Sequence, residues 1–470
     1  MKLILNLLAA SFLALFLTVR LPAQNSEPTI TQLFEFVCNS KTGVCPDGKA
    51  PNSLLQSADG NFYGTTTAGG IGNNAAGTVF KITPSGQLSL LHTFVADANG
   101  DYPNGEFPIS LVEGNDGFLY GTAGGGANNG LVFKLSKTGK FEVLNSAVGV
   151  QPFSLILGRD GDLYGATLNI GLALPGTLFR ITPTGSYTLL HTFNSSFNGP
   201  LAEGPRALGI TLASDGNLYG TTVGRQTIIT TFFRLTPAGV FDVFFTFHYA
   251  QFPVSAPVQD SNGNLYASLS RFEDKALPGL FETNLSGSNP TQIALPFAFV
   301  NFMQNLTPTS DSNLWGILFQ DDPNASVVSI SPIGALLQSI ALDGTNGAAP
   351  DAPLVQAPNG KFFGVTQAGG KVEPNEVASG VVFTLNAGLP ASKAEIVNLN
   401  PSRGTVGSQI MIQGTHFVGT TAVTFNGLNA AFKVLNTGNI LAIVPEGAST
   451  GPIGVTNPGG ASNEATFTVE

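Results

Sequence analysis

A short motif recurs seven times along the chain and constrains its fold more than any other feature. The segment ADGNFYGT returns as NDGFLYGT, RDGDLYGA, SDGNLYGT, SNGNLYAS, SDSNLWGI and PNGKFFGV. The aromatic residues of the seven copies are Tyr63, Tyr120, Tyr164, Tyr219, Tyr266, Trp315 and Phe363, and the six intervals between them average 50 residues. A regular period of this length indicates that each copy is one supersecondary unit that packs against its neighbours.

A second motif follows each copy by 13 to 19 residues and completes the unit. It reads GTVFKITPSG in the first unit and SGVVFTLNAG in the seventh, with Phe80 and Val382 at the fourth position. Asp-Gly and Asn-Gly pairs are strong hairpin signals, and Thr-Pro-Ser-Gly is typical of a tight turn. Each unit therefore predicts four short strands, and such units at this period predict a β-propeller. Helical repeats are excluded, because no unit contains ten residues of helical periodicity.

The seventh unit has no fourth strand of its own, because the chain passes from Ala387-Gly388 into LPASKAE. An unpaired strand-like segment, TITQLFEF at residues 29–36, precedes the first unit. We expect this segment to complete the seventh blade, since pairing there covers an open sheet edge and closes the ring. The predicted fold is therefore an all-β, seven-bladed propeller over residues 28–390, closed by its N-terminal strand.

These units resemble the GloVer tandem repeat, which occurs in exported bacterial proteins. The residues that carry the resemblance are DGNFYGTTTAGG, GTVFKITPSG and linking loops with Asn-Gly before Pro, such as NGDYPNGEFP. It covers about residues 28–390, is strongest in units one to four and is weakest in units five and six. The resemblance implies a repeat-built exported protein and brings no catalytic residue with it.

The repeat ends before residues 394–470, which form a separate module. Its alternating segments QIMIQG, AVTFNG, ILAIVP, GPIGVTN and ATFTVE are separated by turn residues, as in a small β-sandwich. The module resembles an IPT/TIG immunoglobulin-like domain in NPSRGTVGSQIMIQGTHF, VTFNG and VPEGASTGPIGVTNPGG. This resemblance implies an extracellular spacer or adhesion module.

The first 23 residues have the pattern of a secretory signal peptide. Lys2 precedes an apolar run from Leu3 to Val19, and Leu21-Pro22-Ala23 offers a small residue at the cleavage point. The alternative is an uncleaved membrane anchor, since the run has the minimum length of a span. We expect export with cleavage and no membrane span afterwards. In an exported protein, Cys38 and Cys45 predict a local disulfide.

The composition limits the classes of partner. Charged residues make up 11% of the chain and the net charge is −10, so the clustered Lys and Arg of a nucleic-acid interface are missing. A hydrophobic content of 43% indicates a folded chain. No nucleic-acid partner is expected.

Motifs for cofactor or metal chemistry are weak. The glycine-rich loops match neither the phosphate-binding P-loop nor the dinucleotide pattern. The stretch DANGDY begins like an EF-hand but lacks the required Gly and Glu. A looser calcium site formed by Asp97, Asp101 and Glu106 is one hypothesis, and hydrogen-bonded Asx turns in a surface loop are the alternative. No other cofactor is predicted.

The sequence predicts no catalytic residue. His92 and His191 occupy the same LHTF slot in two units, which makes them repeat positions, and no serine-nucleophile motif is present. Loop aromatics between the blades, Tyr102, Tyr249 and Phe252, are the candidate ligand-binding residues for a carbohydrate or protein partner. We therefore expect an exported, non-enzymatic binding or surface protein. The alternatives are an enzyme acting on a polysaccharide or lactone in the propeller funnel, and a purely structural surface or matrix component.

Overall fold

The computed structural model describes residues 27–470 except positions 73, 126–129, 147, 149–150, 169–174, 194–205, 224–228, 249–250, 272–278, 296–302, 320–324 and 372. The described residues form strands and turns and include no helix, and hence no helix long and apolar enough to cross a membrane. The expected signal peptide, residues 1–23, lies outside the described residues.

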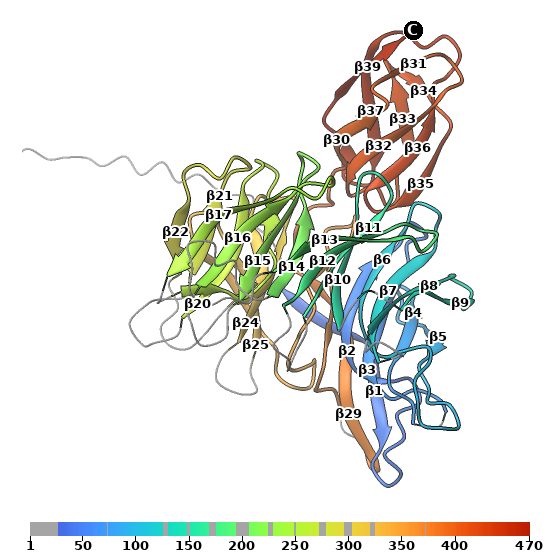
Figure 1. Cartoon of the computed structure of the whole chain (residues 1–470), viewed down its shortest axis with the longest axis vertical. Coiled ribbons are helices and arrows are strands. Elements are labelled where there is room, and N and C mark those ends of the chain that lie inside the picture. Colours follow the sequence, from blue (N-terminus) through green and yellow to red (C-terminus); the bar gives the residue numbers. More distant parts are fainter. Residues whose placement is uncertain are drawn as a thin grey trace, which may run out of the picture.

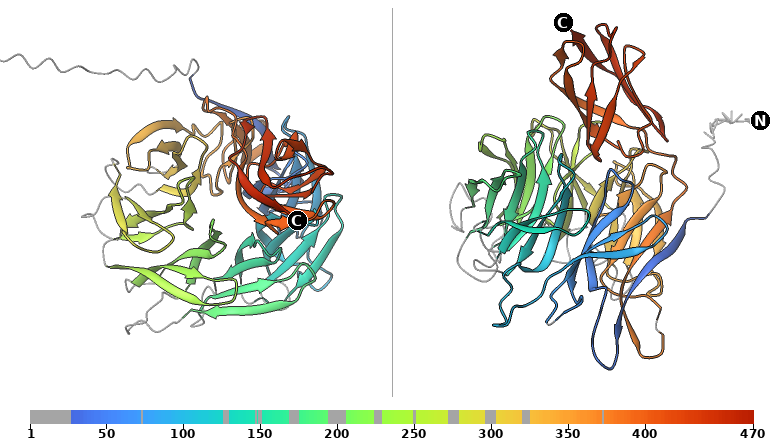
Figure 2. Two further views of the ribbon diagram at one scale, coloured as in Figure 1. Left: turned by 90° about the horizontal axis from the view of Figure 1, so that it is seen from above. Right: turned by 90° about the vertical axis from the view of Figure 1, so that its right-hand side faces the viewer.

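Seven antiparallel sheets follow one another along the chain and form a ring, which Figure 2 shows from above. The strands of the first four blades are β2 (Lys49–Gln56), β3 (Phe62–Ala68), β4 (Thr78–Ile82), β5 (Leu88–Thr93); β6 (Glu106–Glu113), β7 (Leu119–Gly124), β8 (Gly130–Leu135), β9 (Phe141–Asn145); β10 (Pro152–Leu157), β11 (Leu163–Thr167), β12 (Thr177–Ile181), β13 (Tyr187–Thr192); and β14 (Arg206–Leu212), β15 (Leu218–Val223), β16 (Ile229–Leu235), β17 (Phe241–His248).

The remaining blades follow the same plan with one irregularity. In blade five both β18 and β19 pair with β20, so its inner strand is split. The strands of blades five to seven are β18 (Gln251–Pro253), β19 (Val258–Gln259), β20 (Leu265–Arg271), β21 (Gly279–Thr283), β22 (Thr291–Ala294); β23 (Met303–Pro308), β24 (Leu314–Phe319), β25 (Ala325–Ile330), β26 (Leu336–Ala341); and β27 (Val355–Gln356), β28 (Phe362–Thr366), β29 (Glu376–Asn386) with β1 (Thr29–Asn39).

The N-terminal strand completes the last blade, as predicted. β1 pairs antiparallel with β29 from Thr29 opposite Asn386 to Asn39 opposite Glu376, and the two strands lie side by side in Figure 1. β1 is three residues longer than the segment predicted from the sequence, residues 29–36, and contains two register irregularities. The prediction of a seven-bladed propeller closed by its N-terminal strand is confirmed.

Seven clusters of buried apolar side chains hold the ring together, one between each pair of adjacent blades. The cluster at the closing seam joins blade seven to blade one. There Phe36 of β1 lies 5.4 Å from Phe80, and Phe62 stacks on Phe363 at 4.0 Å between ring centroids. Since the seam is as aromatic as the other interfaces, closure buries a complete core.

The glycine after the motif tyrosine has a packing role. A Cβ atom on Gly64 would lie 2.4 Å from the Phe80 ring, and one on Gly165 would lie 2.2 Å from the Phe179 ring. In blade seven the corresponding glycine is Gly364, and the phenylalanine that packs over it is Phe383, which lies opposite it in the strand pairing. The sequence-based alignment that put Val382 at this position is therefore wrong by one residue.

The motif tyrosines are buried between blades and bonded to carboxylates. Tyr63 and Tyr120 donate to Asp59 and Asp116 at 2.8 Å, and blades three and four repeat the pair. Burial raises the pKa of Tyr120 to about 12. The nearby Asp116 carboxylate adds to this rise, and Lys134 opposes it. These hydroxyls are therefore protonated donors that fasten the hairpin turn to its own blade.

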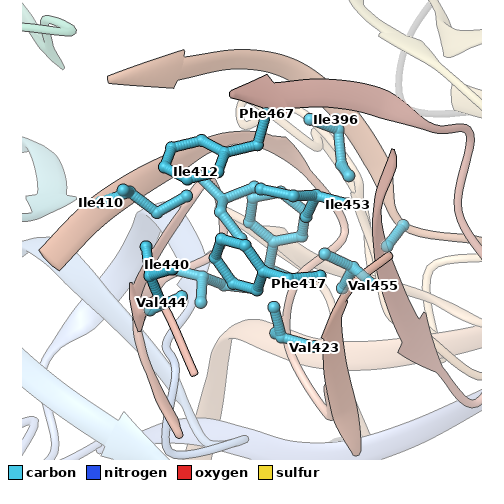
Figure 3. Close-up of a cluster of buried hydrophobic side chains, with 13 residues drawn as sticks. Ile396, Ile410, Ile412, Phe417, Val423, Ile440, Val444, Ile453, Val455 and Phe467 are labelled. Carbon is cyan, nitrogen blue, oxygen red and sulfur yellow. The ribbon is translucent and has the colours of Figure 1, made fainter. Parts of the chain in front are cut away.

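The C-terminal domain is a two-sheet sandwich, as predicted. One sheet contains β30 (Glu395–Asn400), β32 (Gln409–Thr415), β36 (Asn439–Ile443) and β35 (Phe432–Asn436); the other contains β31 (Arg403–Gly404), β39 (Ala465–Val469), β37 (Gly451–Asn457), β33 (Ala422–Phe425) and β34 (Leu428–Asn429), with β38 (Gly460–Ala461) on β37. Figure 3 shows the core between the sheets, in which Ile412 and Ile440 of one sheet face Ile453 and Phe467 of the other.

The predicted disulfide is present and lies at the closing seam. Cys38 is in β1, opposite Val377 of β29, and is bonded to Cys45. The Cys45 carbonyl accepts a hydrogen bond from Gly70 N of blade one at 2.8 Å. The disulfide thus links the closing strand to the first blade.

We expect the double variant Cys38→Ser, Cys45→Ser to lose about 2–3 kcal/mol of stability, the loop-entropy value for so short a closed loop. Calorimetry should show a Tm lower by a few degrees, and hydrogen exchange should accelerate over residues 39–48. Wild type in reductant should behave like the variant, and the variant should not respond to reductant. An unchanged Tm with unchanged exchange would contradict the role assigned to this disulfide.

Two histidines predicted to be repeat positions are indeed stacking residues between blades. His92 lies on Phe141 of the next blade at 3.9 Å between ring centroids, and His191 lies on Phe241 at 3.8 Å. Burial lowers the pKa of His92 to about 4. The neutral ring is thus the form that the folded protein prefers.

This preference predicts a pH dependence of stability. Below about pH 6.5 the unfolded chain takes up a proton at His92 that the folded protein excludes until about pH 4, so stability falls over this window as the pH is lowered. The variant His92→Phe keeps the stacking and removes the proton. Its Tm should match the wild type near pH 7.5 and exceed it at pH 5. Parallel Tm profiles across this window would rule out a neutral buried His92.

Candidate functional site

The two faces of the propeller differ in what connects the strands. In an antiparallel four-stranded blade the first and third turns lie at one end, and the second turn and the link to the next blade lie at the other. The first end carries the Asp-Gly and Thr-Pro turns and is called here the turn face. The other end carries the long glycine-rich and inter-blade loops and is called the loop face.

The C-terminal domain covers part of the turn face. Figure 1 places it on the side of the ring opposite the loop between β1 and β2. Gln413 Nε2 donates to the Arg159 carbonyl at 3.0 Å, and Asn436 Nδ2 donates to Asn115 Oδ1 at 2.9 Å. Both amide side chains are buried at this contact. The domain is therefore docked on the turns of blades two and three through polar groups.

A cavity of about 440 Å³ remains between the docked domain and the mouth of the central funnel. Its propeller side is formed by half-buried aliphatic side chains on the inner strands of successive blades: Leu55, Leu111, Ile156 and Leu212. Its other side is formed by the turns around Thr415 and Thr437 of the C-terminal domain. The cavity therefore has an apolar floor and a polar roof.

Among the described residues that line this cavity, Glu113 is the one carboxylate. Its Oε1 accepts from Ser57 Oγ at 2.9 Å and lies 2.5 Å from Lys137 Nζ, and its Oε2 accepts from Ala58 N at 2.9 Å. Burial raises the pKa of Glu113, and these donors oppose that rise. Because both oxygens are engaged, Glu113 joins blades one and two and is not poised for acid or base chemistry.

Of the three predicted ligand-binding aromatics, the structure describes the side chain of Tyr102 alone. Tyr102 is half-buried, and its hydroxyl donates to the Asn74 carbonyl at 2.8 Å, so it pins one loop of the face to another. Tyr249 lies outside the described residues. Phe252 is in β18, opposite Ser270, and its side chain is also outside the described part. Their role in binding stays a prediction.

The residues proposed for calcium make main-chain turn contacts. Asp97 Oδ1 accepts from the amides of Asn99 at 2.8 Å and Asp101 at 3.0 Å, which is an Asx turn. Glu106 lies against Gly125 of the neighbouring strand connection, and burial raises its pKa. Across the described positions, no group of three His, Cys, Asp or Glu side chains is arranged to hold a metal. The structure lends the calcium site no support, and it stays a prediction.

Four exposed apolar side chains on the loop face had no signal in the repeat pattern. We call them the seam patch: Val44, Ile71, Phe107 and Val377. Ile71 is 67% exposed and Phe107 is 48% exposed. Val44 and Ile71 are sequence neighbours of Cys45 and Gly70, whose backbone groups are hydrogen-bonded to each other. The amide of Phe107 donates to the Ala76 carbonyl of blade one. Val377 of β29 lies opposite Cys38 of β1. Val44, Ile71 and Val377 thus lie by the seam where the ring closes, and Phe107 lies on the other side of blade one, where blade two begins.

Phe107 is the least expected member of the seam patch. Its φ of 48° lies in the left-handed region, and Ala50 and Gln151 adopt the same backbone at the corresponding position of their units. The fold therefore requires this conformation but not a phenylalanine, which is costly there. A half-exposed phenylalanine where other units have Ala50 or Gln151 makes this part of the loop face a candidate interaction surface.

Comparisons with known proteins give two matches to families and remote structural neighbours. No curated protein matches the sequence. A fungal alcohol oxidase in complex with copper has 12% identity and a TM-score of 0.46, covering 94% of this chain and 98% of its own. A puromycin-hydrolyzing peptidase of Mycobacterium tuberculosis has 13% sequence identity and a TM-score of 0.46, and the match covers 72% of this chain and 52% of the peptidase. A protein from Lactobacillus plantarum has 16% sequence identity and a TM-score of 0.46, and the match covers 66% of this chain and 95% of that protein. At these values the likeness is no guide to activity.

The family matches are specific to the two parts of the chain. The model described as the Gloeobacter/Verrucomicrobia repeat matches residues 27–227 and 108–281, which together exceed half of the chain and end in blade five. The IPT/TIG domain matches residues 394–469. The chain therefore belongs to the Gloeobacter/Verrucomicrobia repeat family and ends in an IPT/TIG domain.

Proposed function

We propose that this chain is an exported, non-enzymatic binding protein that contacts a protein partner through the seam patch on its loop face. The observation that carries the proposal is the group of exposed aliphatic and aromatic side chains beside the closing seam and at the start of blade two, with Phe107 held in a backbone conformation that disfavours it. Aliphatic side chains such as Val44 and Ile71 offer no ring on which a sugar could stack, so they favour a protein over a carbohydrate.

The position of the IPT/TIG domain supports this choice of face. The domain covers part of the turn face and leaves the loop face free, so a partner approaching the seam patch does not compete with it. The seam itself is reinforced by the disulfide and by the aromatic core, which hold the patch in one arrangement before binding. A rigid, preformed surface loses less entropy when it binds.

Export is tested by the N-terminus of the mature protein. When the full chain is produced in a bacterium with a secretion pathway, protein sequencing of the exported material should begin at Gln24, after the small residue Ala23. Arginine in place of Leu8 and Leu13 should interrupt the apolar run and keep the chain in the cytoplasm. Recovery of intact Met1 in the membrane fraction would instead support an uncleaved anchor.

Contact through the seam patch is tested with charged variants. Labelled mature protein should bind intact cells of the source bacterium in flow cytometry, and protease treatment of the cells should abolish the signal. Ile71→Asp and Phe107→Asp should each weaken binding at least tenfold, because a charge would be buried in the interface. Asp tolerates the left-handed backbone of residue 107, so folding should be preserved.

Ile333→Asp is the matched control, because Ile333 is 82% exposed on a turn of blade six and belongs to the turn face. It should bind as the wild type does. Binding that survives protease and is competed by extracted polysaccharide would identify a carbohydrate partner in place of a protein. Equal binding by all three variants would refute the seam patch as the contact surface.

A further inference from the structure

The cavity under the IPT/TIG domain contains a buried amide that its own fold leaves without a partner. Gln56 ends the inner strand of blade one, is 8% exposed and lines the cavity. Among the described residues its side chain makes no hydrogen bond. Its amide atoms are not among the solvent-inaccessible unpaired atoms of the protein, so they are open to the cavity that Gln56 lines.

The repeat explains why Gln56 is unpaired. At the corresponding position of blades two and five, Glu113 accepts from Ala58 N of the preceding blade at 2.9 Å, and Gln259 accepts from Ser214 N at 2.7 Å. Gln356 makes the same contact with Ser310 N. The blade that precedes Gln56 has Pro358 at the donor position, and proline has no N–H. The two N–H donors and the carbonyl acceptor of the Gln56 side-chain amide are thus free to bind another molecule.

The remaining lining sets the chemistry of what Gln56 would bind. The floor beside it is aliphatic, with Leu55 and Leu111 half-exposed to the cavity. Of the two charged lining groups, Glu113 is paired with Lys137, and the Arg159 guanidinium donates to the neutral carbonyls of Ala213 and Ser214. A volume of about 440 Å³ is within the range of about 300–1,000 Å³ typical of small-molecule sites, which often lie between domains.

We propose that this cavity binds an uncharged amphipathic small molecule, with an alkyl chain on the leucine floor and an amide or hydroxyl head paired with Gln56. The site is separate from the seam patch and lies on the opposite face of the propeller. The polar contacts that dock the IPT/TIG domain also form the roof, so the bound molecule would touch both domains.

Octanamide is a suitable probe, and isothermal titration calorimetry with the full mature chain is the measurement. The wild type should bind octanamide, and octylammonium should bind at least tenfold more weakly, because the lining carboxylate, Glu113, is already paired with Lys137 and cannot serve as its counterion. Gln56→Leu should weaken octanamide binding about three- to tenfold, the effect of one hydrogen bond. The same variant should not lower the Tm, because the Gln56 side chain makes no hydrogen bond to another described residue that the substitution could remove.

Two further variants keep the test independent of folding effects. Gln356→Leu alters the same repeat position outside the cavity and removes its bond to Ser310, so it should lower the Tm and leave octanamide affinity unchanged. Thr437→Trp places a large side chain in the cavity from an exposed turn and should abolish binding. Failure of octanamide to bind, binding by Gln56→Leu equal to the wild type, or tighter binding of a charged probe would overturn the proposal.

Discussion

The pairing of β1 with β29 is the contact on which the rest of the architecture depends. A ring of sheets has no free faces only when its last blade meets its first, and an unfinished blade would leave an open strand edge. Here residues more than 300 positions apart supply adjacent strands, from Thr29 opposite Asn386 to Asn39 opposite Glu376. The aromatic cluster of Phe36, Phe62 and Phe363 then turns this backbone pairing into a buried interface. Loss of the pairing would expose that core and the two edges together.

In blades one to four, packing follows from two residues that the motif places side by side. Glycine after the tyrosine admits the phenylalanine ring of the next strand, and the tyrosine hydroxyl donates to the aspartate of the hairpin turn. Blade five keeps the second contact with a different carboxylate. Its turn has Asn262 in place of aspartate, and Tyr266 donates instead to Glu282, which replaces the Lys or Arg of the earlier blades. The carboxylate has changed strands while the tyrosine keeps its acceptor.

The repeat pattern is why so much of the fold could be predicted from the sequence. Seven copies give independent readings of the same four strands, so the blade count, the closing strand and the disulfide needed no structure. The weakest copy produced the error: in blade seven two valines precede Phe383, and the alignment chose Val382. The sandwich was equally accessible, because its alternating segments correspond to β32, β33, β36, β37 and β39. Contacts between the domains, such as that of Gln413 with the Arg159 carbonyl, were not, because they depend on how two separate units meet.

At the candidate sites, two kinds of residue have different roles. Residues whose type suggests catalysis or metal binding have structural roles, whereas residues that depart from the repeat are the candidates for binding. Tyr63, His92 and Asp97 look reactive or ligating when read singly, and each is used by turns or by packing between blades. Phe107 and Gln56 look ordinary, yet each is an exception to its repeat. Phe107 is a bulky residue at a position of positive φ where Ala50 and Gln151 stand in other units. Gln56 faces Pro358, which has no N–H, whereas Gln259 accepts from the Ser214 amide. A residue type that recurs at the same position of several units is explained by the fold. An energetically costly exception in one unit is not, so it is a better indication of a binding site than a reactive residue type alone. Finding such exceptions requires the backbone dihedral angles and the hydrogen bonds, which the sequence alone does not contain.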